Sequence, residues 1–379
     1  MWQEKLKSMK RTSFCSLVLL VLFSFGCDKQ SSDYSDYFCE PESNQIDIRI
    51  DSLSFERISP EVSGVSYLGY SGIQGGSLFF ADRLFASLYQ FDKNGDLEGV
   101  RIRKGNGPHE VPTSRFEAYC VSDEGHHLFL DGSTNLYEFD ENFNSVNNVL
   151  YFWSKKITDG EVCEQTDSYC TSYGNVNLTV SNGLMYTNIS GESDDFNFTL
   201  PEYYELTRII EPRDVKTGVP HPLLGRLSPS VGYMEAFQGV FFKIRDNGDF
   251  VVAYEADDLM YVYDKSFNLR YSFGHKGLDM NKDYKRLSIE NFYEELSEEQ
   301  KTKGYYTSLC LVGDLTFRTY LTGQPKDQTR LQVYDGTTLI GDIQVPEGFK
   351  TLGYIEPYYY SEFICDEEKE SMEIYRFKL

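Results

Sequence analysis

One short segment of this chain concentrates residue types that do chemistry in proteins. It reads Lys104-Gly-Asn-Gly-Pro-His-Glu110, and Arg115 follows it. Basic, imidazole and carboxylate groups close together can bind an anion or exchange protons with a ligand. Glycine-rich loops also cradle phosphates, but this one lacks the GxxxxGK[ST] spacing and no helix pattern follows it. We predict a rigid connection between sheet units, whose ligand-facing polar groups would be Lys104, Asn106, His109, Glu110 and Arg115.

Other motifs resemble ion sites but are better explained as turns. Asp92-Lys-Asn-Gly-Asp96 alternates oxygen ligands, yet its glycine is fourth where an EF-hand loop needs it sixth. Asn-Gly is instead a strong hairpin signal, because a type I′ turn needs positive φ at both central residues. His126 and His127 are neighbours in a turn, and on a strand they would point to opposite faces. We therefore predict hairpins and two surface histidines.

Signatures of catalysis and of bound cofactors are missing from the sequence. Gly64-Val-Ser-Tyr-Leu68 lacks the second glycine of GxSxG, and neither CxxC nor the Cys/His spacing of a zinc site occurs. The 59 acidic residues make some carboxylate pair inevitable, but a glycosidase needs two at a defined separation. We predict no catalytic residue, no metal site and no cofactor.

The first 44 residues carry the most specific signal in the chain. Residues 1–26 have a basic start, a short apolar middle and a small residue at the end, which predicts a signal peptide. Gly26-Cys27 resembles a bacterial lipoprotein signal, in which Cys27 becomes the acylated N-terminus. Residues 27–44 are polar and predict a flexible tether. Acids in this stretch resemble the export signal of surface-displayed lipoproteins in Bacteroidota, or simply belong to a solvated linker.

These features predict a cell-envelope protein held to the membrane through its lipid anchor only, with the outer membrane favoured and surface exposure as an extension. Six cysteines remain beyond Cys15 and Cys27, and six allow 15 pairings. Cys163 and Cys170 flank a short polar stretch and form one candidate disulfide. Cys120 stands in an apolar stretch, which predicts a buried thiol.

The composition excludes two broad classes of protein. The formal net charge is −23 at pH 7, and such a surface repels phosphate backbones, so nucleic acid is excluded as a partner. Apolar residues make up 40% of the chain and aromatic residues 15%, which excludes general disorder. The remaining length allows one large all-β domain.

Strand patterns dominate from residue 45 onward. Ile46-Asp-Ile-Arg-Ile-Asp51 alternates apolar and polar residues, as a half-buried strand does. A β-rich run that ends on aromatic-Asp and a turn then recurs along the chain. Its four copies are Leu88–Leu97, Leu136–Phe143, Met260–Leu269 and Leu331–Leu339.

This recurrence predicts an all-β fold, a single six-bladed β-propeller over 45–379. The first five blades would cover 62–105, 114–152, 173–215 (irregular), 236–275 and 303–346. The sixth would join 349–379 to the N-terminal strand at 45–57, closing the ring without an open edge. A helical insertion is predicted near 285–302, where helix formers and apolar residues recur at helical spacing. Irregular insertions are predicted at 153–172 and 211–235, and such loops commonly build binding surfaces.

The lipoprotein-type start, the aromatic-Asp turns and the 104–110 segment together resemble TolB-like six-bladed β-propeller lipoproteins of Bacteroidota. Members often carry Gly-x-Gly-Pro-Gly-Glu after the first blade, and here His109 replaces the third glycine. Tyr305–Asp314 and Tyr320–Gly323 are similar to the family's penultimate blade. The resemblance implies fold and location, and it implies no chemistry.

Two functions remain open at this point. The first is a non-catalytic binding module for a protein, peptide or glycan partner in the envelope, in keeping with 29 tyrosines that can stack on a ligand. The second is a glycan lyase or hydrolase whose site is assembled in the propeller funnel. Converging ionisable groups with shifted pKa values would favour the enzyme. Ser52, in Asp51-Ser-Leu53, also matches a short O-glycosylation acceptor of Bacteroidota.

Overall fold

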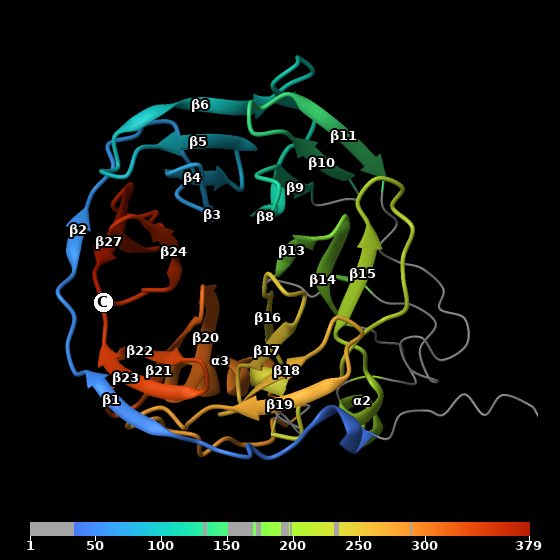
Figure 1. Cartoon of the computed structure of the whole chain (residues 1–379), viewed down its shortest axis with the longest axis vertical. Helices are drawn as coiled ribbons and strands as arrows, with labels where there is room; N and C mark the ends of the chain where they lie inside the picture. The colour runs from blue at the N-terminus through green and yellow to red at the C-terminus, as the bar shows by residue number, and fades with distance from the viewer. Residues whose placement is uncertain are drawn as a thin grey trace, which may run out of the picture. The chain divides into compact units, whose positions relative to one another are not determined.

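The computed structural model describes residues 34–131, 135–150, 170–171, 176–190, 197, 199–230, 235–288 and 290–379. The chain divides into two compact units, Met1–Asp36 and Tyr37–Leu379. In the second unit, six sheets stand around a common axis like the blades of a propeller (Figure 1). The predicted six-bladed β-propeller is therefore confirmed.

The first two blades follow each other directly and are built of hairpins. Blade one contains β3 (Gly69–Gln74), β4 (Ser77–Asp82), β5 (Ser87–Phe91), β6 (Leu97–Lys104) and β7 (Glu110–Val111). Blade two contains β8 (Phe116–Val121), β9 (His127–Asp131), β10 (Asn135–Phe139) and β11 (Ser145–Leu150). In both, the first of these strands lies nearest the axis.

The third blade is irregular, as predicted, whereas the fourth is regular. Blade three contains β12 (Cys170–Thr171), β13 (Leu178–Ser181), β14 (Leu184–Ser190) and β15 (Ile210–Asp214). Beyond β15, two isolated bridges, Ile210–Leu224 and Arg213–Pro220, take the place of a further strand in the described chain. Blade four contains β16 (Val240–Ile244), β17 (Phe250–Tyr254), β18 (Met260–Tyr263) and β19 (Leu269–Phe273).

The N-terminal strands join the last two blades and close the ring. Blade five contains β20 (Lys303–Val312), β21 (Leu315–Gly323), β22 (Thr329–Asp335) and β23 (Thr338–Gln344). Blade six contains β24 (Thr351–Ile355), β25 (Tyr358–Ser361), β26 (Ile364–Asp366) and β27 (Ser371–Phe377). β2 (Glu56–Ile58) pairs with β27 and closes the ring, as expected of the N-terminal segment.

The strand that the alternation predicts most clearly belongs to a different blade from the one expected. β1 (Ile46–Ile50) runs parallel to β23 and is the outermost strand of blade five. The prediction placed it in the sixth blade together with residues up to 57. Alternation specifies a strand and its buried face, but not the partner, so the sequence did not separate β1 from β2.

Aspartate side chains stabilise the repeated turns that the sequence predicts. The carboxylate of Asp140 accepts hydrogen bonds from the backbone N–H groups of Asn142 (2.9 Å) and Asn144 (2.8 Å). Asp92 and Asp264 do the same for residues two and four positions further on. These carboxylates stabilise the turns through hydrogen bonds within each hairpin, as the hairpin interpretation predicts.

Apolar side chains between neighbouring blades form the core. Phe79 and Ile102 of blade one pack with Phe116 and Phe129 of blade two, and each of these residues is fully buried. The largest cluster lies between blades three and four and includes Tyr254. Each blade is thus held by the two beside it.

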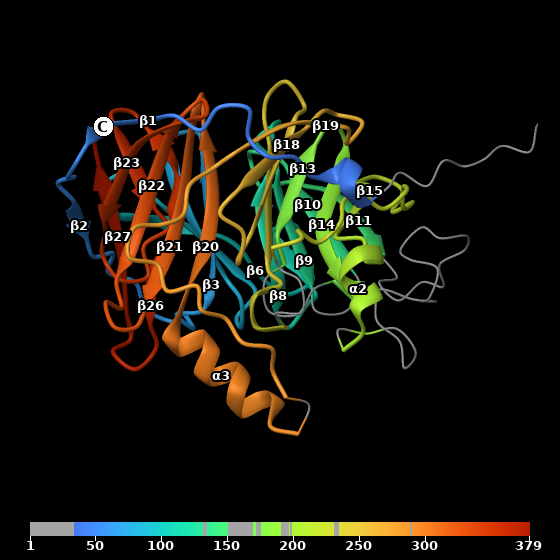
Figure 2. The ribbon, with the colours of Figure 1, turned by 90° about the horizontal axis from the view of Figure 1, so that it is seen from below.

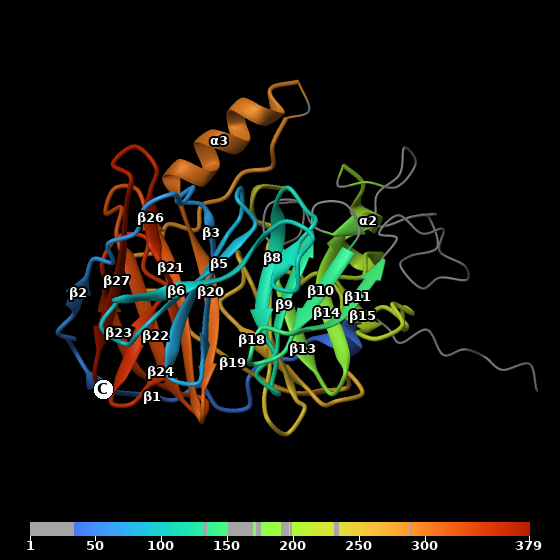
Figure 3. The ribbon, with the colours of Figure 1, turned by 90° about the horizontal axis from the view of Figure 1, so that it is seen from above.

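Four helical segments accompany the sheets in the described chain, three of them short and the fourth an 11-residue α-helix. They are η1 (Tyr34–Tyr37), α2 (Pro201–Leu206), η2 (Glu235–Phe237) and α3 (Phe292–Thr302). α3 lies within the insertion predicted at 285–302, and it projects from the face of the ring opposite β1 (Figures 2 and 3). None of the described helices is long and apolar enough to cross a membrane.

The end of the predicted tether is fastened to blade four. The backbone oxygen of Tyr37 accepts a hydrogen bond from the Tyr263 hydroxyl (2.7 Å), and that of Cys39 accepts one from Ser272 (2.7 Å). The Asn44 side chain bonds to the carbonyl of Gly274. The compact unit therefore begins at residue 37 and not at 45, since polar composition alone did not reveal these contacts.

Candidate functional site

Four of the five predicted ligand-facing residues lie on the outer edge of blade one. They are Lys104, Asn106, His109 and Glu110, all exposed, at the end of β6, in the following loop and at the start of β7. The Glu110 carboxylate accepts a hydrogen bond from the Gly107 N–H (2.7 Å), and His109 Nδ1 lies 2.7 Å from the Phe143 carbonyl oxygen. These side chains fasten the loop to itself and to blade two.

Arg115 is separated from the other four. It precedes the innermost strand of blade two, and its Nη2 lies 2.7 Å from Glu117 Oε1. Arg83 of blade one contacts the other oxygen of the same carboxylate, also at 2.7 Å. The five predicted residues therefore do not form one site.

The remaining predicted sites have different outcomes. Cys27 and Cys163 lie outside the described residues, and Cys170 begins β12. Ser52, the predicted O-glycosylation site, is exposed in the segment between β1 and β2. The four cysteines that the structure resolves as free thiols are Cys39, Cys120, Cys310 and Cys365. Cys120, predicted to be a buried thiol, is half-buried, and burial raises its pKa to about 12.

One histidine prediction was wrong. His127 is fully buried, and its Nδ1 lies 2.9 Å from the Tyr119 hydroxyl, while His126 contacts Glu138 at 2.8 Å. Burial lowers the pKa of His127 to about 4, so it stays neutral. His127 is the first residue of β9 and faces blade one, which the turn pattern did not indicate. Within the described ranges, no group of three or more His, Cys, Asp or Glu residues could hold a metal ion.

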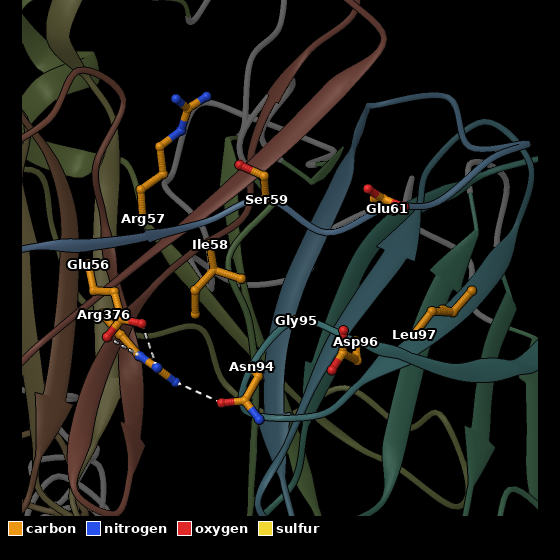
Figure 4. Close-up of a pocket in the computed structure, with 10 residues that line it drawn as sticks. All are labelled: Glu56, Arg57, Ile58, Ser59, Glu61, Asn94, Gly95, Asp96, Leu97 and Arg376. Atoms are coloured by element: carbon orange, nitrogen blue, oxygen red, sulfur yellow. Dashed lines mark hydrogen bonds and ion pairs between the residues drawn. The ribbon is translucent and has the colours of Figure 1, made fainter.

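A polar cavity of about 500 Å³ lies at the seam where the ring closes. Figure 4 shows its lining, which comes from β2, β27 and the Asp92–Asp96 hairpin. Arg376 spans it, bonding to both oxygens of Glu56 and to the side-chain oxygen of Asn94 (3.2 Å). The Arg376 guanidinium therefore holds β2 against β27 and the Asp92–Asp96 hairpin. We interpret the residues at this seam as structural.

A second group of residues gathers where blades four, five and six begin, at the inner ends of the strands next to α3. We call it the inner-rim cluster; its members are Phe237, Glu255, Tyr284, Tyr305 and Lys350. They come from η2, the loop after β17, the segment before α3, β20 and the residue before β24. β16, β20 and β24, beside which they lie, are the innermost strands of their blades (Figure 1).

Aromatic rings form one side of the inner-rim cluster. The buried Phe237 ring lies 4.8 Å from the Tyr284 ring and 5.0 Å from the Tyr305 ring, centroid to centroid. The Tyr284 hydroxyl donates a hydrogen bond to the Gly304 carbonyl (2.6 Å), which fixes its ring. Tyr305 is half-buried, and its hydroxyl has no hydrogen-bond partner in the part of the chain that is described. This arrangement presents two fixed, partly accessible rings.

Glu255 is the titratable centre of the inner-rim cluster. Its backbone N–H donates to the Gly239 carbonyl (2.9 Å), its carbonyl accepts from the Tyr306 N–H (3.0 Å), and its Oε2 accepts from the Gly239 N–H (2.9 Å). A Cβ on Gly239 would lie 2.2 Å from the carboxyl carbon, so any other residue there would displace the Glu255 side chain from this position. Burial raises the pKa of Glu255 to about 7, against smaller lowering effects of the Gly239 hydrogen bond and the Lys350 charge.

A buried arginine holds the loop that carries Glu255. Arg318, fully buried on β21, donates hydrogen bonds to the carbonyls of Tyr254 (3.0 Å), Asp257 (2.6 Å) and Asp258 (2.8 Å). Its guanidinium also lies over the Tyr306 ring, 3.3 Å from the centroid. The backbone on both sides of Glu255 is thereby fixed, and the carboxyl is preorganised.

Sequence reasoning missed the inner-rim cluster completely. Glu255 stands in Tyr254-Glu-Ala-Asp-Asp258, where nothing distinguishes it from other acids. Its chemistry depends on Gly239, Tyr305 and Lys350, which are far away along the chain. The arrangement brings a half-buried carboxyl and two partly accessible tyrosine rings to neighbouring segments of the inner rim.

Comparison with known proteins supports the propeller fold and does not indicate a function. No family model and no curated protein matches this sequence. The structure is similar to that of a DUF4221 family member from Bacteroides vulgatus, with a TM-score of 0.63 and 13% identity over 86% of this chain and 98% of that one. This similarity shows the propeller fold alone.

More distant similarities reach a putative exported protein from Bacteroides fragilis (TM-score 0.47, 12% identity, 88% and 98% of the two chains). They also reach a gluconolactonase from Xanthomonas campestris (TM-score 0.45, 10% identity, 89% and 95%). At these TM-scores neither similarity bears on function.

Proposed function

We propose that this protein is a lipid-anchored β-propeller of the cell envelope that binds a glycan on its inner rim, without catalysing a reaction. The observation that carries the proposal is the pair of fixed, partly accessible rings, Tyr284 and Tyr305, beside polar groups with free bonding capacity. Sugar rings pack their apolar faces on aromatic side chains while their hydroxyls bond to neighbouring polar groups. A rigid propeller suits this role, because little ordering is needed on binding.

Binding of the detergent-solubilised full-length protein to a glycan array tests this function. We expect Tyr305→Ala to reduce the array signal at least tenfold, because the variant loses the stacking surface. Tyr293→Ala is the matched control, since Tyr293 is a highly exposed tyrosine on α3. Equal loss in both variants, or wild-type binding to proteins and to no glycan, would reject the proposal.

One observation favours the second candidate, a glycan-active enzyme. A glutamic acid with a pKa of about 7, as in Glu255, can give up a proton near neutral pH. Hydrolysis also needs a second group to activate water or form a covalent intermediate. Release of reducing ends from a bound glycan, abolished by Glu255→Gln, would establish the enzyme over the binding module.

The anchor is tested separately. The lipoprotein-type sequence supports acylation at Cys27, so labelled palmitate fed to expressing cells should enter the wild-type protein and not Cys27→Ala. Label that persists in Cys27→Ala would contradict the anchor and leave the inner-rim proposal unaffected.

A further inference from the structure

Asp258, in the loop between β17 and β18, and Lys282, in the segment before α3, form a partly exposed ion pair. Lys282 Nζ lies 2.8 Å from Asp258 Oδ1, and the side chains of Lys282 and Asp258 are 17% and 30% exposed. The Tyr306 hydroxyl lies 3.0 Å from the same Asp258 oxygen. In the described part of the chain, Asp258 Oδ2 has no hydrogen-bond partner and Lys282 contacts no other carboxylate. The pair therefore keeps an acceptor oxygen and ammonium N–H donors for a ligand.

The backbone is fixed at both partners of this ion pair. The Asp258 carbonyl accepts a hydrogen bond from the buried Arg318 (2.8 Å). Next to Lys282, the Asn281 carbonyl accepts a hydrogen bond from the Gly304 N–H at the start of β20 (2.8 Å). The two charged side chains therefore need little ordering when a ligand binds to them.

The ion pair lies beside the Tyr284 ring of the inner-rim cluster. Tyr284 follows Lys282 by two residues, and its N–H donates to the Lys282 carbonyl (2.9 Å). The Tyr284 hydroxyl donates to the Gly304 carbonyl (2.6 Å), and Tyr306, two residues further along β20, contacts Asp258. The ring and the pair are thus joined through Lys282 on one side and through β20 on the other. These contacts place a charged pair next to a stacking surface.

A carboxylate and an ammonium held side by side match two hydroxyl groups on neighbouring carbons of a sugar. One hydroxyl donates to the free carboxylate oxygen while its neighbour accepts from the ammonium, and hydrogen bonds to charged groups are the stronger ones. The pair is neutral as a whole, and the chain has a net charge of −23. A neutral sugar therefore fits this place better than an anionic one, which the surrounding charge repels.

Resting on the glycan-binding function above, we propose that the ligand is a neutral glycan with a free vicinal diol. Asp258 accepts a hydrogen bond from one hydroxyl of the diol, Lys282 donates to the other, and the Tyr284 ring packs on the face of the sugar. A sugar without the diol leaves both charged groups without the partners that replace water, which lowers its affinity.

Inhibition of glycan-array binding tests this inference on the full-length protein. The inhibitors are the methyl glycosides of glucose, galactose and mannose, each compared with its 3-deoxy analogue. The 3-hydroxyl belongs to both vicinal pairs of free ring hydroxyls in these sugars, so its removal abolishes the diol and keeps the ring that stacks. We expect at least one parent sugar to halve the array signal at a concentration at least tenfold lower than its 3-deoxy analogue.

Variants of the ion pair test which residues read the diol. Lys282→Met and Asp258→Asn should bind the array more weakly through the remaining rings, and the tenfold preference for the parent sugar should fall to about twofold or less. Lys369→Met is the matched control, because Lys369 forms an ion pair with Asp366 (2.6 Å) on the turn before β27. It should keep both the signal and the preference.

Equal inhibition by parent and 3-deoxy sugars, or inhibition by neither, with Tyr305→Ala still defective on the array, would overturn the diol inference and leave glycan binding intact. A full tenfold preference in both Lys282→Met and Asp258→Asn would remove the ion pair from the site. The lack of an array signal for any glycan would overturn the proposed function itself. Retained far-ultraviolet circular dichroism of both variants establishes that a lost preference is not a loss of folding.

Discussion

Glu110 on the outer edge of blade one and Glu255 on the inner rim of blade four each accept a hydrogen bond from the N–H of a glycine. Glu110 bonds to Gly107, three residues away, on an exposed loop. Glu255 bonds to Gly239, 16 residues away, and is half-buried. The first contact closes a loop locally, and the second holds a carboxyl where it is poorly solvated. The same glycine contact therefore has different consequences according to how far the fold buries the carboxyl.

Removing the support of the inner rim should produce the largest effect. Arg318→Met leaves three buried carbonyls without their donor, so we expect a loss of about 3–5 kcal/mol in the free energy of unfolding, together with loss of glycan binding. Urea denaturation measures the first quantity. Arg101→Met is the control on blade one, where the half-buried arginine bonds to Gln90, and it should cost about 1 kcal/mol or less. Equal costs would show that Arg318 has no special supporting role.

The pH dependence of stability should separate the two glutamates next. Glu255 releases its proton near pH 4.5 in the unfolded chain and near pH 7 in the folded one, so stability falls as pH rises through this window and then levels. Glu255→Gln should equal wild type at pH 4 and exceed its unfolding free energy at pH 8 by about 1–3 kcal/mol. Glu110→Gln, which removes the same charge from an exposed position, should differ from wild type by less than about 1 kcal/mol at both values. Parallel curves for wild type and Glu255→Gln would contradict the burial of this carboxyl.

A change in the outer loop should affect stability a little and binding not at all. A Cβ on Gly105 would lie 2.0 Å from a Glu110 carboxylate oxygen, and the residue has φ +156°. We expect Gly105→Ala to cost about 1–2 kcal/mol in urea denaturation, because the carboxylate must move away from the Gly107 N–H. Glycan-array binding should be unchanged. A tenfold loss of the array signal in Gly105→Ala would indicate that the glycan binds at the 104–110 loop and not at the inner rim.

The parts of the fold that the sequence predicted are those set by short-range contacts. The turns at Asp92, Asp140 and Asp264 are made by side chains that form hydrogen bonds within four residues. Because the pattern is local, its recurrence in the sequence was enough to predict the positions of three blades. The position of β1 was missed because its parallel partner, β23, lies almost 300 residues further along the chain. Strand alternation contains no information about such a partner.

The candidate site could not be predicted from the sequence either, because its residues are far apart along the chain. The 104–110 segment was predicted as a site because its polar and charged residues are adjacent in the sequence. In the structure, Glu110 forms a hydrogen bond within this segment and His109 contacts the Phe143 carbonyl of blade two. The inner-rim cluster draws single residues from blades four, five and six, whose innermost strands are separated in the sequence and are neighbours only in the closed ring. Burial, which gives Glu255 its unusual pKa, is a property of that assembly.

Crystals soaked with a glycan that the array identifies test the central claim most directly, because the electron density shows where on the ring that glycan binds. We predict sugar density stacked on Tyr305, and none in the seam at Arg376 or along the 104–110 loop. Ordered sugar at the seam or the outer loop, with an empty inner rim, would contradict the account.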